Sequence, residues 1–324
     1  MYRYCQGGGG RAEQAFTMAE ILLSLTIIGV VAAITLPSLT GNINERTWNT
    51  QRKALYARFS QAIALMPALN GYGADNLDTA AETFVTAGLS KVLKINNICD
   101  SEHLPDCGLS STILMLSGDG SINFPKTMAE LNTQMVVTGT SPSFTNHMSN
   151  TKAAAFETVN GESLAIYYNP NCVSSTNSTE VSVPMQPMVC ANFIYDLNGN
   201  KGPNTVGKDI GFLTVFYPSD SVVAAPYVKR ENAVHENSWV DASNYCTGQD
   251  KEYRLPTAEE AASIFVNKRL QDDDHFLGTG NGAIWTSSLG YTSSGTKAWA
   301  QNISNGSRLL VSRASQYSAR CVKR

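Results

Sequence analysis

The fold is decided near the start of the chain, by the apolar stretch FTMAEILLSLTIIGVVAAITL that runs from Phe16 to Leu36. A helix of this length is roughly 31 Å long, which is enough to cross the ~30 Å hydrocarbon core of a bilayer. A secretory signal is one interpretation, with cleavage after Val31-Ala32-Ala33. Signal peptides, however, have an apolar core of only about 7–15 residues and carry no carboxylate at its start. We therefore expect a membrane-spanning helix.

The one ionisable residue of this stretch is Glu20. An unpaired charge in the middle of a membrane costs at least about 2.5 kcal/mol, and residues of this kind normally have a partner. A plain membrane anchor does not explain such an acid, so we expect Glu20 to have a specific role.

The start of the chain resembles the N-terminus of type IV pilins and of type II secretion pseudopilins. The resemblance rests on a short hydrophilic leader, then Phe16-Thr17-Met18-Ala19-Glu20, then an apolar run that ends at Pro37. It implies that a prepilin peptidase cuts between Ala15 and Phe16 and that the new amine of Phe16 is methylated. It also implies that Glu20 meets the terminal ammonium of a neighbouring subunit as a filament grows. Ala15 departs from the family, which usually has Gly at that position, and the leader is only weakly basic.

The helix is expected to continue beyond the apolar stretch. Between Asn42 and Met66, apolar residues recur at spacings of three and four, which is the pattern of one helix face; they are Leu55, Tyr56, Phe59, Ala62, Ile63 and Met66. Pro67 is expected to end the helix. The resemblance implies that this half of the helix packs on a sheet. The expected fold class is therefore α+β, with a long N-terminal pilin helix packed on an antiparallel-sheet head.

The cysteines bear on the cellular compartment. Cys99 and Cys107 are eight residues apart, and Cys172 and Cys190 are eighteen apart. Local pairing would close two small loops, worth about 3 kcal/mol each in the chain-entropy model. Free buried thiols are the alternative. We expect the disulfides Cys99–Cys107 and Cys172–Cys190, because the anchor would deliver the head to an oxidising compartment.

A segment dense in Gly, Asn and Asp, DLNGNKGPNTVGKD, runs from residue 196 to residue 209 and resembles a loop of pseudopilin-like heads. One interpretation is a calcium site with Asp196, Asn198 and Asp209 as oxygen donors. The spacing does not fit an EF-hand, because Lys201 stands where Gly is needed, and Lys201 and Lys208 would repel the ion. We favour a structural turn and expect no cofactor.

The last hundred residues differ in composition, and three of the four Trp residues lie there. A short helix is expected from Trp239 to Cys246. A second helix is expected after Thr257, because Thr257 and Glu260 have the spacing of a capping box. Four antiparallel strands should follow, at 284–288, 297–303, 307–311 and 319–322.

This part of the chain also resembles a known family. The order WxxAxxYC, YRLPTxEE, WTSS, AW and ARCV, over roughly residues 230–324, resembles a bacterial C-type-lectin-like domain of fibrobacter major-paralogous repeats. The resemblance implies a disulfide Cys246–Cys321 between the first helix and the last strand. Since Cys5 would be lost with the leader, the remaining six cysteines would then pair completely. The expected domains are a leader (1–15), a transmembrane and assembly helix (16–66), a pilin-like head (67–221) and a C-type-lectin-like domain (222–324).

The C-terminal loops are rich in Ser, Gly and Tyr, a composition that suits adaptable recognition surfaces. Plain solvated loops explain the same composition equally well. The candidate ligand-binding residues are Trp285, Ser287, Ser288, Tyr291, Ser293, Ser294, Asn302 and Asn305. No sugar specificity is predicted, because the usual lectin tripeptides are missing.

Composition excludes several function classes. The net charge of −3 excludes a polybasic nucleic-acid binder. Four histidines without a His/Cys cluster do not favour a zinc enzyme. The sequence has no legible grouping of nucleophile, histidine and acid. We therefore expect that the chain is not an enzyme, and a pilin-anchored enzyme is the least favoured function.

The expected function is that of a minor type IV pilin-like subunit of a surface filament, displaying a lectin-like adhesin domain. The alternative is a pseudopilin of a type II secretion system whose extra domain contacts cargo or the secretin. The expected partners are other pilin subunits, prepilin peptidase, the inner membrane and an extracellular ligand, with no nucleic acid. The precursor should lie in the inner membrane with its C-terminal part outside the cytoplasm, and the mature chain in a pilus at the cell surface or in a periplasmic pseudopilus.

Overall fold

The described part of the chain falls into two compact units. The computed structural model describes residues 18–70, 81–114, 121–123, 152–168, 188–217, 221–226, 234–249, 252–267, 282–303 and 308–323. One unit comprises Met1–Asn49 and the other Thr50–Arg324. Both units contain part of one helix.

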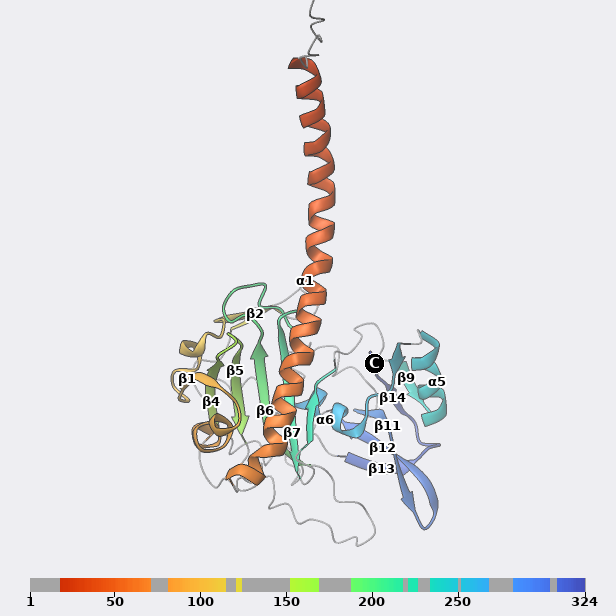
Figure 1. Ribbon diagram of the computed structural model, residues 1–324. Helices are drawn as coiled ribbons and strands as arrows, with labels where there is room; N and C mark the ends of the chain where they lie inside the picture. The colour runs from red at the N-terminus through yellow and green to blue at the C-terminus, as the bar shows by residue number, and fades with distance from the viewer. Residues whose placement is uncertain are drawn as a thin grey trace, which may run out of the picture. The chain divides into compact units, whose positions relative to one another are not determined.

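That helix, α1, extends from Met18 to Asn70 over 53 residues (Figure 1). It passes Pro67, where the sequence predicted its end, and continues to Asn70. A proline removes one backbone hydrogen bond from a helix but does not forbid it. Met66, directly before Pro67, is fully buried.

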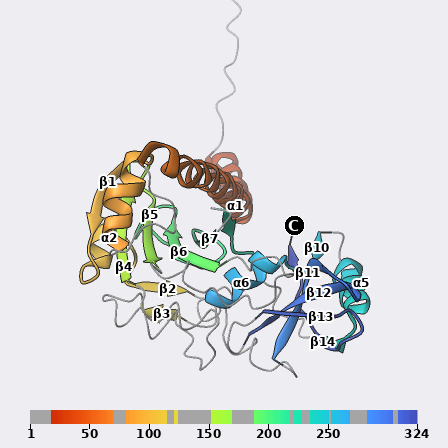
Figure 2. The same ribbon diagram turned by 90° about the horizontal axis from the view of Figure 1, so that it is seen from below.

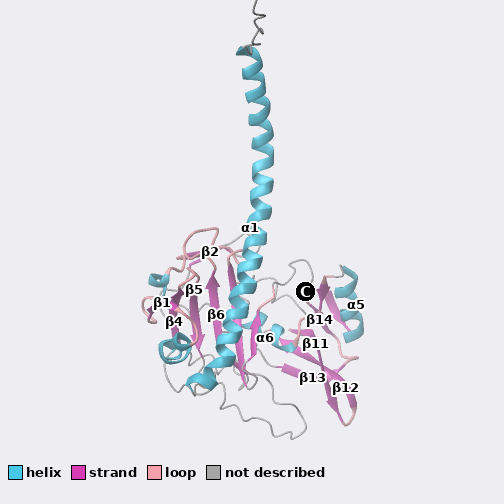
Figure 3. Ribbon diagram, viewed as in Figure 1, coloured by secondary structure: helices cyan, strands magenta, loops and turns pink. Residues whose placement is uncertain are grey.

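The expected membrane-spanning pilin helix is not found, and the predicted fold class is wrong in this respect. Among the residues that the structure describes, no helix is both long and apolar enough to cross a membrane. The described fold is mostly antiparallel sheet, with helices packed on it (Figure 3).

The unit Thr50–Arg324 is built around a six-stranded sheet in which all neighbouring strands are antiparallel. In spatial order the strands are β1 (Ile95–Cys99), β4 (Lys152–Thr158), β5 (Ser163–Tyr168), β6 (Met188–Asp196), β7 (Ile210–Tyr217) and β8 (Ser221–Ala224). Two further strands, β2 (Thr112–Leu114) and β3 (Ser121–Asn123), pair antiparallel with each other and form a separate two-stranded sheet. The predicted boundary between residues 221 and 222 falls inside β8, the last strand of this sheet.

Both faces of the six-stranded sheet are covered, which explains why its central strands are almost continuously apolar. Neighbouring residues of a strand point to opposite faces. Phe193 of β6 meets Phe59 of α1, with ring centroids 4.6 Å apart. Asn192, the residue before it, bonds to Asn267, which follows helix α6 (Ala258–Val266). Figure 2 shows α1 and α6 on opposite sides of the sheet.

Short helices complete the layer on the α1 side. They are α2 (Ala81–Thr83), the π-helical turn η1 (Phe84–Gly88) and the 3-10 turn η2 (Leu89–Lys91), and a further 3-10 turn, η3 (Leu104–Cys107), follows β1. Phe84 packs against Tyr168 with centroids 5.0 Å apart. Of the apolar positions predicted on one face of α1, Tyr56 is 39% exposed, and the others are buried: Leu55, Phe59, Ala62, Ile63 and Met66.

A second sheet lies in the C-terminal part. Its spatial order is β13 (Arg308–Ser312), β12 (Gly295–Asn302), β11 (Ala283–Thr292), β14 (Tyr317–Ala319) and β9 (Val234–Asn237). The helix α5 (Trp239–Gln249) packs on it, and β10 (Tyr253–Arg254) pairs with β15 (Val322–Lys323). β11 and β14 are parallel, so the expectation of antiparallel strands throughout is wrong at this pair.

The two sheets share one core through α6. Its Ala261, Ile264 and Phe265 belong to the same buried cluster as Phe212 and Phe216 of β7. A buried polar network adds to this contact, because Asn192 and Thr214 of the first sheet bond to Asn267 and Ser263. The helix begins with the predicted capping box of Thr257 and Glu260. The C-terminal part is therefore joined to the first sheet by a continuous interior.

Disulfides are present at the expected places. Cys99 pairs with Cys107, and Cys246 of α5 pairs with Cys321, which lies between β14 and β15. Cys190 is also disulfide-bonded. Its expected partner, Cys172, lies outside the described residues. Because disulfides persist in oxidising compartments, they indicate an extracellular protein.

Candidate functional site

The three residues implicated in processing and assembly are not fully described by the structure. Ala15 and Phe16 lie outside the described residues, as does the predicted cleavage point between them. Glu20 lies within α1, but its side chain is not among those described. Their roles therefore stay predictions.

The described N-terminal part of α1 presents an apolar surface. Large apolar side chains are exposed by 48% at Ile21 to 83% at Met18; the set is Met18, Ile21, Leu22, Leu23, Leu25, Ile27, Ile28, Val30 and Val31. The two hydroxyl groups in this segment bond to the backbone of the same helix. Ser24 donates to the carbonyl of Ile21 at 2.9 Å, and Thr26 donates to that of Leu22 at 2.7 Å. We call this set of nine residues the α1 apolar surface.

Only some of the C-terminal candidates lie at the surface. Tyr291 is 74% exposed at the tip of the β11–β12 hairpin, and Ser293 and Ser294 beside it are also exposed. Ser294 shares a 3.0 Å hydrogen bond with Thr292, which shapes the tip. Asn302 is half-buried at the end of β12. Asn305 lies outside the described residues.

Trp285 is a core residue rather than a ligand contact. Its side chain is fully buried, its indole N–H donates to the carbonyl of Asn237 at 2.7 Å, and its ring packs edge-on against Tyr317. Since both its apolar surface and its polar group are used internally, the earlier assignment of Trp285 to ligand binding is corrected.

Ser287 and Ser288 likewise have structural partners. The backbone N–H of Ser287 donates to the carbonyl of Pro256 at 2.7 Å, and its hydroxyl contacts the same oxygen at 3.2 Å. Ser288 accepts from the backbone N–H of Ala258 at 2.9 Å and so satisfies one of the free donors at the start of α6. Of the candidate ligand-binding residues that the structure describes, those exposed to solvent are Tyr291, Ser293 and Ser294.

The loop from residue 196 to residue 209 joins β6 to β7 and brings its three predicted donors together. Asp209 is fully buried and accepts from the backbone N–H groups of Asn204 and Thr205, each at 2.8 Å. Asp196 is also fully buried and accepts from the N–H of Asn198 at 3.1 Å. Thr205 additionally pairs with Leu114 in an isolated bridge. The loop is thus fixed at several points.

The electrostatics of this loop are unusual. The pKa of Asp196 is raised to about 7, chiefly by burial and in part by the nearby charge of Asp209, against the opposing effect of hydrogen bonds from the N–H groups of Asn198 and Gly199. Lys201 and Lys208, which were expected to repel a cation, are both exposed to solvent. Two buried carboxyl groups therefore lie close together.

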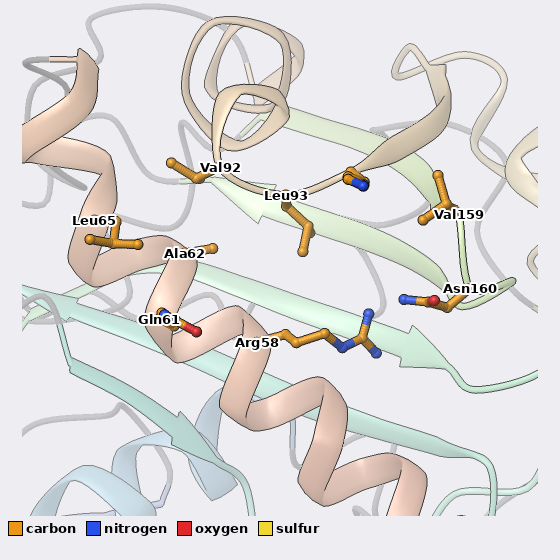
Figure 4. A pocket seen from close by; sticks show the side chains of 9 residues that line it. Arg58, Gln61, Ala62, Leu65, Val92, Leu93, Val159 and Asn160 are labelled. Atoms are coloured by element: carbon orange, nitrogen blue, oxygen red, sulfur yellow. The ribbon is translucent and has the colours of Figure 1, made fainter.

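A cavity of about 440 Å³ lies elsewhere, between α1 and the β4–β5 turn. Figure 4 shows the side chains that line it: Arg58, Gln61, Ala62, Leu65, Val92, Leu93, Lys94, Val159 and Asn160. Arg58 forms an ion pair with Glu162, so its charge is neutralised within the protein. This cavity was not predicted, because its walls come from three segments that are separate in the sequence.

Comparisons with known proteins do not assign a family. No family model matches the chain, and no curated protein matches it. A solved structure of a mutant von Willebrand factor A1 domain in complex with botrocetin aligns at 13% identity over 30% of this chain and 88% of the matched chain, with a TM-score of 0.20. A TM-score this low establishes no shared fold.

One residue of the β6–β7 loop was missed by the sequence analysis. Asn204 has a positive φ of 49°, and its backbone N–H bonds to Asp209. Asn is among the few residues other than Gly that adopt this conformation readily. The Pro203-Asn204 pair was a usable signal, because both residues are typical of turns.

Proposed function

We propose that this chain is a subunit of an extracellular filament, assembled through the α1 apolar surface, and that it displays the tip of the β11–β12 hairpin to an external ligand. The observation that carries the proposal is the exposure of nine large apolar side chains on one helical segment. Exposed apolar areas of this extent mark interaction sites. A helix that is apolar on all sides is normally buried in a larger interior.

The proposed occupant of this surface is the same helix of neighbouring subunits. Burying one large apolar side chain contributes about 1.5–3 kcal/mol, so even partial coverage of the α1 apolar surface would stabilise a helix-lined core. Because exposed apolar residues lie all around the helix, one copy can contact several neighbours, as a filament requires. Heterologous contacts that do not close into a ring generate filaments.

The resemblance of Phe16–Glu20 to type IV pilins supports the same proposal. Cleavage before Phe16 would give a new terminal ammonium group, and Glu20 of a neighbouring subunit could pair with it. This ion pair would compensate the charge of Glu20 in an apolar core. The disulfides support assembly outside the cytoplasm. In a major component, every subunit of the filament would carry the additional C-terminal sheet, and each sheet would have to avoid clashes with adjacent subunits. We therefore propose a minor component.

Glu20→Ala is expected to keep the chain folded but to remove it from filaments. The quantity to measure is the amount of the chain in filaments sheared from cells of the native host, by immunoblot. We expect a decrease of at least tenfold, which corresponds to a loss of about 1.4 kcal/mol of assembly free energy per subunit.

Glu45→Ala is the matched control, because Glu45 is an exposed acid on the same helix. It should be incorporated like the wild type. Normal incorporation of Glu20→Ala, or retention of the wild-type chain in the cell envelope with none in the sheared fraction, would contradict the proposal.

A further inference from the structure

Three oxygen atoms of the β6–β7 loop are buried without a hydrogen-bond partner. They are Oδ2 of Asp196, Oδ1 of Asn198 and Oδ1 of Asn204. The filament proposed above makes no use of them. A buried acceptor left without a partner costs about 1–3 kcal/mol, and more when it is charged. Three such atoms within nine residues of sequence therefore call for a ligand.

The surrounding hydrogen bonds hold these oxygens in place. The amide nitrogen of Asn198 donates to the carbonyls of Lys201 at 2.6 Å and Gly202 at 3.2 Å, and this fixes which side of the amide is left free. The backbone of Asn204 is tied to Asp209. The other carboxylate oxygen of Asp196 is tied to the backbone of Asn198. The loop is thus ordered without using the three free oxygens.

The chemistry of the group selects the ligand. All three free atoms are oxygens, and the fourth side chain of the group, Asp209, is a second buried carboxylate. Within the described part of the chain, no three His, Cys, Asp or Glu side chains come together in a way that could hold a metal ion, so an ion in this loop needs amide oxygens as ligands in addition to carboxylates. Carboxylate and amide oxygens in a loop are the ligands of hard divalent cations, and calcium accepts six to eight of them in flexible geometry.

We propose that the β6–β7 loop binds a calcium ion through Asp196, Asn198 and Asn204, with Asp209 supplying the second negative charge. Carbonyl groups or water would complete the coordination. The ion would relieve the unpaired burial of Asp196 and fix the connection between β6 and β7. Sites of extracellular modules bind calcium with dissociation constants of about 10⁻⁴–10⁻³ M, and this site is expected in that range.

The test is a calcium titration of the purified full chain, which is first stripped of metal with EDTA and dialysed. Isothermal calorimetry should show one site, and 10 mM CaCl₂ should raise the Tm by about 3–8 °C. Asp196→Asn removes a ligand charge and should weaken binding at least tenfold. Asp106→Asn, an exposed acid of the turn η3, is the matched control and should bind like the wild type.

A second variant keeps the test decisive if Asp196→Asn does not fold. Asn204→Asp retains a residue that tolerates positive φ and adds a negative charge, so it should bind calcium several-fold more tightly than the wild type. No binding to the wild type at 10 mM calcium would overturn the inference, as would equal affinities of Asn204→Asp and the wild type. Neither result depends on filament assembly, so the two proposals can fail separately.

Discussion

Ile28→Arg is expected to exclude the chain from filaments while leaving the unit Thr50–Arg324 folded. Ile28 is 64% exposed on the α1 apolar surface, so replacing it removes no intramolecular core contact. In an assembled core, however, an arginine would bring an unpaired charge into an apolar interior. By translocon scales such a charge costs about 2.5–3.5 kcal/mol. The amount of the variant in sheared filaments should therefore fall by about a hundredfold or more.

The chain offers a closely matched control. Leu69 is also 64% exposed and lies on the same helix, but at its C-terminal end, outside the α1 apolar surface. Leu69→Arg should enter filaments at the wild-type level. Equal incorporation of both variants would show that the α1 apolar surface is not an assembly surface, and equal exclusion of both would point to a general defect of export or folding.

Cys246→Ser is expected to lower the free energy of unfolding by about 4.5 kcal/mol in the chain-entropy model. The bridge to Cys321 spans 75 residues and is fully buried at both ends. Because α6 packs on the six-stranded sheet, the loss should be felt in both sheets at once. Urea unfolding followed by tryptophan fluorescence and by far-UV circular dichroism should give coincident transitions at lower urea.

Cys99→Ser provides the comparison within the same chain. Its bridge to Cys107 spans only eight residues, so the expected loss is smaller, about 2.5 kcal/mol. If Cys246→Ser instead left the midpoint unchanged, or if fluorescence and dichroism separated into two transitions, the continuous interior described above would be contradicted.

Local patterns were sufficient to predict several features of the fold. The three- and four-residue spacing of apolar residues identified the buried face of α1, including Leu55 and Phe59, because helix geometry alone puts such positions on one side. The capping box of Thr257 and Glu260 depends on residues three apart and was equally legible. The Cys246–Cys321 bridge came from a family resemblance rather than from spacing.

Features that depend on long-range packing could not be predicted. Nothing near Trp285 in the sequence indicates that its indole would be enclosed, since the enclosing groups come from Asn237 and Tyr317. The docking of α6 on the first sheet pairs residues such as Asn192 and Asn267 that are 75 positions apart. The predicted membrane span rested on the length of an apolar stretch and on its difference from a signal peptide, and no described helix is long and apolar enough to cross a membrane.

The β6–β7 loop contains donors that could be predicted from the sequence and one that could not. Composition pointed to Asp196, Asn198 and Asp209, and the structure places all three in one loop. The positive charges of Lys201 and Lys208 argued against a cation, yet both side chains are exposed to solvent. The missing donor, Asn204, is recognisable only once its backbone conformation and its bond to Asp209 are known.

Photo-crosslinking at position 28 shows which molecules contact the α1 apolar surface in an assembled filament. A photoreactive amino acid replaces Ile28 in the full chain, which is expressed in its native host and irradiated before the filaments are sheared. We expect covalent adducts with a second copy or with another filament subunit, recovered in the sheared fraction. Adducts with lipid alone, or no protein adduct in cells that carry filaments, would contradict the proposed assembly.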